Sequence, residues 1–429
     1  MSAKVQLQIK QGKDAGKIFP FTEHDTFVFG RMSDCHACIP DDGQVSRHHF
    51  ILEANPPQAC LRDLGSLNGT WVNGKKFGAR EKGETPEKGA KQRYPEVALK
   101  HGDRIKVGGT EVEVSIEQPK EAPRHRVDPE VGDISLLSPE QLAGLIFGSP
   151  DQAAGKPKLQ IPGCKIEAEI GRGGFGAVYR AWRAGDGKIV AVKVMLARVD
   201  ADDAAIQKFK REVAVTAKLQ HPNIVRVQES GASGAVFYFV MEFCDGGSAW
   251  DLMLKNGGRL SLSQAKSIIL GALSGLAYAH DKGFVHRDLK PQNVLLSGSE
   301  VRLSDFGLSK SFQQAGLSGM SMTGGFAGTP YFMPREQITN FKYVKPVSDV
   351  WSMGATIYNM LTGTFPYPFS EKRDPIDVIL NEEVVPIRKR DKSLPKKLCA
   401  ILDKALEKKI KDRYQTATEM SAAIKQALL

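Results

Sequence analysis

Residues 286–293 read His-Arg-Asp-Leu-Lys-Pro-Gln-Asn, and Asp305-Phe306-Gly307 follows twelve residues after Asn293. An aspartate such as Asp288 can accept the proton of an attacking hydroxyl group, and Lys290 can neutralise a phosphoryl group in transfer. Asn293 and Asp305 bring hard oxygen atoms, which are the ligands that Mg²⁺ prefers. Asp-Phe-Gly alone is usually only a turn, but at this distance behind residues 286–293 it predicts a phosphoryl-transfer site.

Two segments upstream add groups that hold nucleotide phosphates. Residues 171–176 read Gly-Arg-Gly-Gly-Phe-Gly and precede the strand-like Ala177-Val178-Tyr179. Dinucleotide-binding folds share this glycine spacing, but there a helix follows. A strand instead predicts a hairpin whose backbone N–H groups approach the phosphates of ATP, where side chains would clash. Val178 is expected to pack on the adenine ring.

Lys193 is the candidate ligand of the α- and β-phosphates. It follows Ala191-Val192 at the end of a strand that looks buried. A lysine in such a place needs a carboxylate partner, and we expect Glu212, on a predicted helix over 203–219, to supply it. A surface lysine at a strand end is the common alternative, but it fits poorly beside a glycine-rich hairpin.

Length and composition indicate a protein with more than one domain. The chain has 429 residues, of which 41% are apolar and 25% are charged, which is typical of two or three globular domains. Six cysteines are too few for a disulfide scaffold and favour a reducing compartment. The first residues lack the apolar core of a signal peptide, and no apolar run approaches a membrane span. We therefore expect a cytoplasmic protein without membrane contact.

The formal net charge of +10 raises the possibility of nucleic-acid binding. The basic residues are nevertheless spread along the chain, and the cluster at 388–390 has no interleaved aromatic residues. A solvated basic surface is the better interpretation, so no nucleic-acid partner is predicted.

Hydrophobic patterns divide the chain into three segments. Residues 1–118 alternate apolar and polar positions between frequent turns, which predicts an all-β sandwich with a long polar loop over 78–95. Residues 119–160 predict a proline-rich linker with a short helix over 138–147. Residues 161–429 begin with strand-like segments and continue with long helical patterns. The predicted fold class is multidomain: a β sandwich followed by an α+β domain with a small β-rich lobe and a larger helical lobe.

The four motifs together resemble a eukaryotic-type protein kinase over residues 164–429. Lys290 and Gly328-Thr329-Pro330 are similar to the serine/threonine branch. The resemblance implies transfer of the γ-phosphoryl group of Mg-ATP to serine or threonine hydroxyls, with ATP and Mg²⁺ as cofactors. It implies catalytic roles for Asp288, Lys290, Lys193 and Glu212 and a metal-binding role for Asn293 and Asp305. The ATP-binding positions that it implies are Ile170, Gly171, Arg172, Gly173, Gly174, Phe175, Gly176, Ala177, Val178, Lys193, Glu242 and Cys244.

Supporting positions follow from the same resemblance. Met241 corresponds to the gatekeeper of the nucleotide pocket. Asp349 with Trp351 resembles the pair that anchors the catalytic loop, and Arg413 would pair with Glu336.

Two departures bear on substrate recognition. The family's Ala-Pro-Glu triplet is Pro334-Arg335-Glu336 here, which adds a cation beside the peptide platform. Gln292 and Ser248 occupy places where relatives directed to basic peptides often carry glutamate, so a strong preference for arginine-rich peptides is not predicted.

The activation segment, from Asp305 to Glu336, is expected to be ordered by phosphorylation, because a phosphate there could pair with Arg287. The candidate phosphorylation sites are Thr323, Ser321 and Ser318, with Thr323 preferred. Hydroxyl groups in a glycine-rich loop are also often merely solvated.

The N-terminal segment carries a second set of motifs, Gly30-Arg31, residues 46–49 (Ser-Arg-His-His) and Asn68-Gly69-Thr70. A guanidinium fork, a hydroxyl donor and an amide suit a phosphate on a peptide. These residues resemble the forkhead-associated (FHA) domain, a phosphothreonine-binding module, over residues 1–118. The resemblance assigns the phosphopeptide to Arg31, Ser46, Arg47 and Asn68, and a structural role to His49. Leu67 stands where the family often has a polar residue, and a sandwich with a decayed site is the alternative.

Cys35, His36 and Cys38 hint at a metal site. Only two thiols are local, whereas a tetrahedral zinc site needs four ligands, so packing is the favoured interpretation.

The leading hypothesis is an active serine/threonine kinase with an attached phosphothreonine-binding module, a combination that looks bacterial. A catalytically silent scaffold that binds phosphopeptides is the alternative. The expected partners are protein substrates with serine or threonine and phosphothreonine peptides. Residues 121–160 contain no threonine, so we expect self-association in which the module docks on phosphorylated Thr323, with Thr85 as the second choice.

Overall fold

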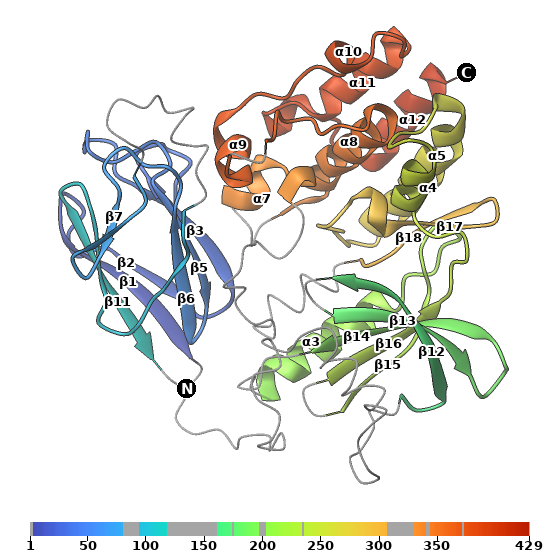
Figure 1. The fold of residues 1–429 in the computed structure, drawn as a ribbon, viewed down its shortest axis with the longest axis horizontal. Coiled ribbons are helices and arrows are strands. Elements are labelled where there is room, and N and C mark those ends of the chain that lie inside the picture. The colour runs from blue at the N-terminus through green and yellow to red at the C-terminus, as the bar shows by residue number, and fades with distance from the viewer. Residues whose placement is uncertain are drawn as a thin grey trace.

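The computed structural model describes residues 3–79, 94–117, 161–173, 176–196, 203–233, 236–306, 330–339, 344–370 and 373–428. Most of the predicted polar loop, the linker with its helix and all candidate phosphorylation sites lie outside these residues. Figure 1 shows three bodies: an N-terminal β sandwich in blue and teal, a small β-rich lobe in green and a large helical lobe in yellow to red.

The N-terminal sandwich consists of two sheets with strand orders β2-β1-β11-β10-β7-β8 and β4-β3-β5-β6-β9. The predicted alternation places Val5, Leu7 and Ile9 in the core, where β1 pairs antiparallel with β11. The strands are β1 (Lys4–Gln11), β2 (Ile18–Phe21), β3 (Asp25–Gly30), β4 (Ala37–Cys38), β5 (Phe50–Asn55), β6 (Gln58–Asp63), β7 (Thr70–Val72), β8 (Lys75–Phe77), β9 (Val97–Ala98), β10 (Arg104–Val107) and β11 (Thr110–Glu117).

The small lobe is a five-stranded antiparallel sheet of order β12-β13-β14-β16-β15, accompanied by helix α3 (Asp203–Thr216). The Phe209 ring of α3 lies edge-on to Phe237, with ring centroids 5.0 Å apart, so an aromatic contact joins the helix to the sheet. The strands are β12 (Cys164–Gly173), β13 (Gly176–Arg183), β14 (Ile189–Leu196), β15 (Val227–Ser233) and β16 (Val236–Glu242).

The large lobe is built around α8 (Pro346–Thr362), whose side chains from Val347 to Leu361 are all buried. A helix that is buried on all sides belongs in the centre of a lobe. Ser248 and Ser261 cap α4 and α5 in capping boxes. The other elements are α4 (Ala249–Lys255), α5 (Leu262–Asp281), η2 (Pro291–Asn293), β17 (Val294–Ser297), β18 (Glu300–Leu303), η3 (Pro330–Phe332), α7 (Arg335–Thr339), α9 (Pro375–Asn381), α10 (Ile387–Arg390), α11 (Lys396–Ala405), η5 (Ile410–Asp412) and α12 (Ala417–Ala427).

The predicted fold class, a β sandwich followed by a bilobal α+β domain, is confirmed. In the part of the chain that the structure describes, none of the helices has the length and apolarity needed to cross a membrane.

Candidate active site and peptide-binding loops

The glycine-rich segment forms a hairpin between β12 and β13, in which Gly173 lies opposite Gly176. A Cβ atom on Gly176 would lie 1.9 Å from the Val194 carbonyl oxygen, and its φ of +147° also favours glycine. Ala177 is buried, whereas Ile170 on β12 is half exposed, so the hairpin has one face in the lobe and one outside it. The hairpin tip, residues 174 and 175, lies outside the described residues.

Lys193 is buried within β14, where it lies opposite Val178 on one side and Phe239 on the other, and not at the strand end as the sequence suggested. Its Nζ atom lies 2.7 Å from Oδ1 of Asp305, an ion pair between the two lobes. Glu212 belongs to α3, but its side chain lies outside the described residues, so the predicted pair with Lys193 stays a prediction.

The segment 286–293 places its polar side chains around one carboxylate. The Asp288 carboxylate accepts a hydrogen bond of 2.9 Å from Lys290 Nζ and one of 3.1 Å from Asn293 Nδ2. Asn293 Nδ2 also lies 2.7 Å from the Asp288 carbonyl oxygen, which fixes the amide so that its Oδ1 is the remaining acceptor. The backbone N–H of Ser304 donates to the Asn293 carbonyl oxygen over 2.9 Å. This bond closes the hairpin β17–β18 and brings Asp305 back to Asn293.

Asp349 holds this loop from α8. Its two carboxylate oxygens accept the backbone N–H groups of His286, over 2.6 Å, and Arg287, over 2.9 Å. The side chain is 1% exposed and also lies 2.8 Å from Nε2 of His280. The Trp351 indole N–H donates to the Leu406 carbonyl oxygen, which ties α8 to the end of α11. Asp349 thus anchors the loop, as its resemblance to the family implied.

Two residues of the site have strained backbones. Arg287 has a φ of +67° and Asp305 a φ of +61°, in the left-handed region that non-glycine residues seldom adopt. The hydrogen bond that the Arg287 N–H donates to Asp349 stabilises the first, and the ion pair with Lys193 accompanies the second.

Electrostatics keep Asp305 ionised. Burial alone would raise the pKa of its carboxyl group, but Lys193 and, more weakly, Lys290 and His286 together hold that pKa below its usual value. Burial lowers the pKa of the neighbouring His286, whose ring packs 4.5 Å from the Phe306 ring. The site therefore presents carboxylates to cations and buries its histidine in the neutral form.

An apolar cluster of the small lobe extends to Leu295 of β17 in the large lobe. Met241, Ala191, Val178, Cys244 and Leu295 belong to one hydrophobic cluster, which is suited to a planar base. Leu295 was not singled out from the sequence; its position two residues after Asn293, in an apolar strand, was the available signal.

Two side chains at the end of β16 and just after it are a carboxylate, Glu242, and a thiol, Cys244. Glu242 forms an ion pair with Arg302 of β18. Burial, together with Glu242, raises the pKa of Cys244 to about 11.

The predicted ion pair of Glu336 with Arg413 is present and bidentate, with distances of 2.5 and 3.0 Å. Arg413 is 3% exposed and the Glu336 side chain is 18% exposed, so the pair is largely buried in the large lobe. Next to it, Gln337 Nε2 donates to the Arg287 carbonyl oxygen over 2.9 Å, a link between α7 and residues 286–293 that the sequence did not suggest.

The candidate phosphopeptide-binding residues lie on adjacent loops of the sandwich. The backbone N–H of Arg31 donates to the Ser46 carbonyl oxygen over 3.1 Å, and the Arg31 and Arg47 side chains are exposed. The Ser46 hydroxyl accepts the Leu67 N–H over 2.9 Å, and Asn68 Nδ2 donates to the Gln44 carbonyl oxygen over 2.8 Å. The structure therefore brings all four predicted residues to one end of the sandwich.

His49 is fully buried and braces these loops. Its Nδ1 accepts the Ser46 N–H over 3.0 Å, and its Nε2 lies 3.1 Å from the Gly69 carbonyl oxygen. Burial lowers the pKa of the ring. These contacts support the structural role that the resemblance assigned to it.

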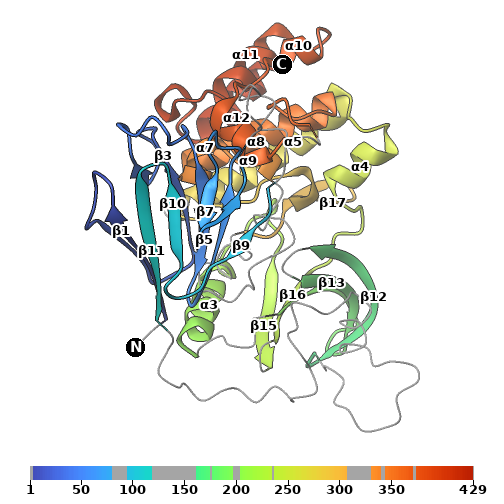
Figure 2. The same ribbon diagram turned by 60° about the vertical axis from the view of Figure 1, so that its left-hand side comes forward.

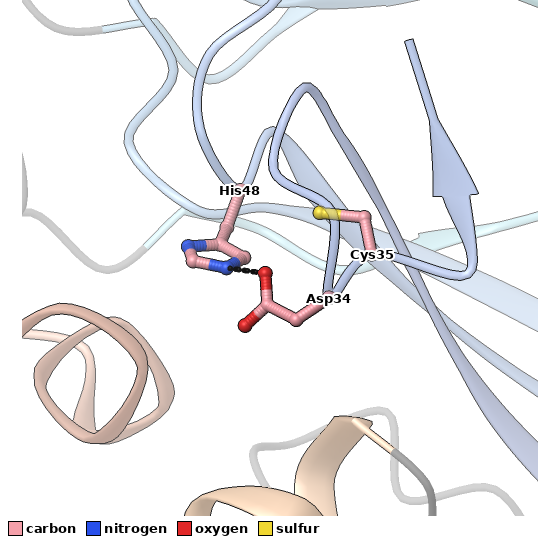
Figure 3. Close-up of side chains that lie close together, drawn as sticks. All are labelled: Asp34, Cys35 and His48. Atoms are coloured by element: carbon pink, nitrogen blue, oxygen red, sulfur yellow. Dashed lines mark hydrogen bonds and ion pairs between the residues drawn. The ribbon is translucent and has the colours of Figure 1, made fainter. Parts of the chain in front are cut away.

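The three residues that hinted at a metal site do not converge. His36 Nδ1 accepts the Val28 N–H and the ring stacks on Phe27, while the Cys35 and Cys38 thiols donate to backbone carbonyl oxygens. Cys35 lies instead beside Asp34 and His48, with the candidate ligand atoms within 4.8 Å of one another (Figure 3). The Asp34 carboxylate forms an ion pair with the Arg335 guanidinium group, which disfavours the binding of a metal cation there.

Comparison with known families agrees with this geometry. The protein kinase domain model matches residues 164–424, which is more than half of the sequence, so the chain belongs to the protein kinase family. The FHA domain model matches residues 27–108 within the sandwich.

Among curated proteins, the chain is 34% identical over 259 residues to a probable serine/threonine-protein kinase PknB of Lactococcus lactis, and covers 40% of it. It is 32% identical over 260 residues to a probable serine/threonine-protein kinase of Clostridium acetobutylicum, and covers 38% of it. Each match covers 60% of this chain. The chain thus spans about two fifths of the length of these relatives.

Among solved structures, the kinase domain of Mycobacterium tuberculosis PknI superposes with a TM-score of 0.50 at 22% identity. The match covers 62% of this chain and 96% of that domain. At this identity the likeness shows the shared fold.

Proposed function

We propose that the chain is a serine/threonine protein kinase that transfers the γ-phosphoryl group of Mg-ATP to hydroxyl groups of proteins. The observation that carries this proposal is a set of two ion pairs: Lys193 of the small lobe pairs with Asp305, and Lys290 pairs with Asp288 within the segment 286–293 of the large lobe. The serine/threonine class rests on Lys290 in the catalytic loop and on the similarity to relatives that are named serine/threonine-protein kinases.

In this mechanism Asp288 orients the substrate hydroxyl group and accepts its proton. Lys290 stabilises charge on the group in transfer, and Lys193 holds the α- and β-phosphates. Most of the rate enhancement comes from positioning and charge stabilisation, because the transition state is loose.

The donor set suits magnesium. Asn293 Oδ1 and the Asp305 carboxylate are hard oxygen donors on two segments joined by a backbone hydrogen bond. They would hold Mg²⁺, which supplies positive charge to the phosphate oxygens when it is bound.

The test is incubation of the purified full chain with Mg-ATP and a generic protein substrate, followed by phosphosite mapping. Phosphate on serine or threonine of the chain or of the substrate is the expected result. If neither is phosphorylated, the catalytically silent scaffold is the better description.

We further propose that the sandwich binds phosphothreonine peptides through Arg31, Ser46, Arg47 and Asn68. The support is their placement at one end of the sandwich, with both guanidinium groups exposed. Exposed arginines are available for bidentate contacts with a phosphate dianion.

Arg31→Ala should weaken phosphothreonine-peptide binding by about 10- to 100-fold, because a hydrogen bond to a charged group contributes about 1.5–3 kcal/mol. Calorimetric titration of the full chain with a phosphothreonine peptide selected from a library measures this affinity. Lys10→Ala is the matched control, since Lys10 pairs with Glu113 on the other sheet and should leave affinity unchanged. Equal affinity for the unphosphorylated peptide would contradict phosphate reading.

Phosphorylated Thr323 is our proposed internal ligand for this module, presented by the same or a second chain. Thr323→Ala should abolish the association that follows autophosphorylation, whereas Ser321→Ala should preserve it. Sedimentation velocity before and after Mg-ATP treatment measures this. Unchanged association of the Thr323→Ala variant would point to another ligand, with phosphorylated Thr85 the next to test.

A further inference from the structure

The outer face of the sheet β4-β3-β5-β6-β9 is apolar and covered. Val28, Ile51 and Leu64 are each at most 4% exposed and belong to the same hydrophobic cluster as the large-lobe core. Figures 1 and 2 both show β3 facing α7, and contacts join these two elements. An antiparallel sheet with a solvated face would carry polar residues at such positions. This face is therefore built to be covered by the kinase lobe.

Ion pairs flank the apolar contact. The Arg335 guanidinium donates through Nε and Nη2 to Oδ2 of Asp34, the first over 3.1 Å. It also donates to the Leu380 carbonyl oxygen of α9. A second pair joins Arg62 of β6 to Asp374, the residue that caps α9, and both side chains are at least nine-tenths buried.

Arg335 is the cation that the sequence placed unexpectedly beside the peptide platform. Its neighbour Glu336 points into the lobe toward Arg413, whereas Arg335 points out toward the sandwich. The family's proline at this position has no side-chain donor, so it could not make this contact. The departure from the family triplet thus coincides with the contact between the domains.

The same contact lies between the two proposed sites. Asp34 and His48 stand on the loops of Arg31 and Arg47, and the Met32 N–H donates to the Arg47 carbonyl oxygen over 3.2 Å. His48 Nε2 lies 3.1 Å from Asp34 Oδ1 and 3.3 Å from Arg335 Nη2. His48 and then Arg335 hold the pKa of Asp34 well below its usual range despite partial burial. On the kinase side, α7 reaches the residue before Asp288 through the Gln337 bond.

We propose that this sheet face is a docking surface for the large lobe of the same chain and that Arg335 is its clamp, which links the phosphopeptide loops to α7. The linker of about 40 residues between the domains is long enough to permit docking within one chain. The link to phosphopeptide binding rests on the proposed function of the FHA domain, but the docking itself does not. Without Arg335, the Asp34 carboxylate loses its guanidinium partner near Arg31, where it opposes a phosphate dianion.

Cys35 offers a direct readout of docking, because the residue is 7% exposed and packs in the shared cluster. In the full chain, Arg335→Glu should speed alkylation of Cys35 by about tenfold or more, which corresponds to about 1.4 kcal/mol of lost docking. The direct electrostatic effect of this substitution is opposite, since Arg335 lowers and added negative charge raises the thiol pKa. Faster alkylation therefore reports exposure. Mass spectrometry of each cysteine measures the rates.

The controls separate undocking from unfolding. Cys399, buried in the large-lobe core, should keep its slow rate in every variant, and Lys10→Glu should change nothing. The charge swap of Asp34→Arg with Arg335→Glu should restore slow alkylation of Cys35. Arg62→Met removes the second ion pair, with Asp374, and should also speed the alkylation of Cys35.

An unchanged Cys35 rate in Arg335→Glu and Arg62→Met, with Cys399 protected, would overturn the proposal. Protection of Cys35 that depends on protein concentration would assign the contact to a second copy and overturn docking within one chain. The link is tested with a phosphothreonine peptide, whose affinity for the full chain should fall at least about fivefold in Arg335→Glu. An unchanged affinity would overturn the link, whereas failure of the wild-type chain to bind would overturn the FHA proposal and leave the docking result standing.

Discussion

Asp288→Asn should lower the rate of phosphoryl transfer by about 100- to 10,000-fold, the usual contribution of a general base. The amide keeps the shape of the side chain and can still approach Lys290 and Asn293, but it cannot accept the hydroxyl proton. Initial rates with Mg-ATP and a protein substrate measure the effect, and nucleotide affinity should change little, because the proposed role of Asp288 is toward the hydroxyl group and not toward the phosphates.

Asp281→Asn is the matched control, since Asp281 is exposed at the end of α5. It should retain the wild-type rate. A rate for Asp288→Asn within a few-fold of wild type would mean that another group accepts the proton, and the mechanism would need a different base.

Arg413→Met should destabilise the large lobe by about 3 kcal/mol, because it leaves the largely buried Glu336 carboxylate without its cation. Arg413 donates two hydrogen bonds to Glu336 and further ones to the Glu407 and Lys408 carbonyl oxygens, all of which would be lost. Denaturant unfolding followed by tryptophan fluorescence measures this, because two of the four tryptophans, Trp250 and Trp351, lie in the large lobe and Trp351 is buried there.

The control for that experiment is Arg259→Met. Arg259 also pairs with an aspartate, Asp391, but its side chain is 59% exposed, and such pairs contribute little. Similar denaturant midpoints of unfolding for the two variants would show that the Glu336–Arg413 pair contributes no more to stability than a surface pair.

The sequence was sufficient to predict the features that depend on local chemistry. The alternation in residues 5–9 predicted a strand of the sandwich, and the motifs at 286–293 and 305–307 predicted carboxylates, a lysine and an amide that meet at one place. These predictions succeeded because each motif fixes its own backbone, and the spacing between motifs leaves one way to combine them.

Features that depend on distant pairing were not predictable in the same way. Asp34 and Arg335 are 301 positions apart, and nothing near either residue indicates the other. Lys193 lies inside β14 and forms an ion pair with Asp305. This pairing depends on how the two lobes are placed relative to each other. The burial of the outer face of the sheet β4-β3-β5-β6-β9 was also not predicted. The alternation of apolar and polar residues indicates the face that packs inside the sandwich, but it does not indicate that another domain covers the opposite face.

The thiol beside Glu242 has a consequence for inhibitor chemistry. Electrophilic compounds directed to the proposed adenine-binding cluster could be designed to bond covalently to Cys244. The thiolate is the reactive species, however, and a pKa of about 11 leaves very little of it at neutral pH. Acrylamide warheads aimed at this cysteine will therefore react slowly, and reversible occupancy must supply most of their potency.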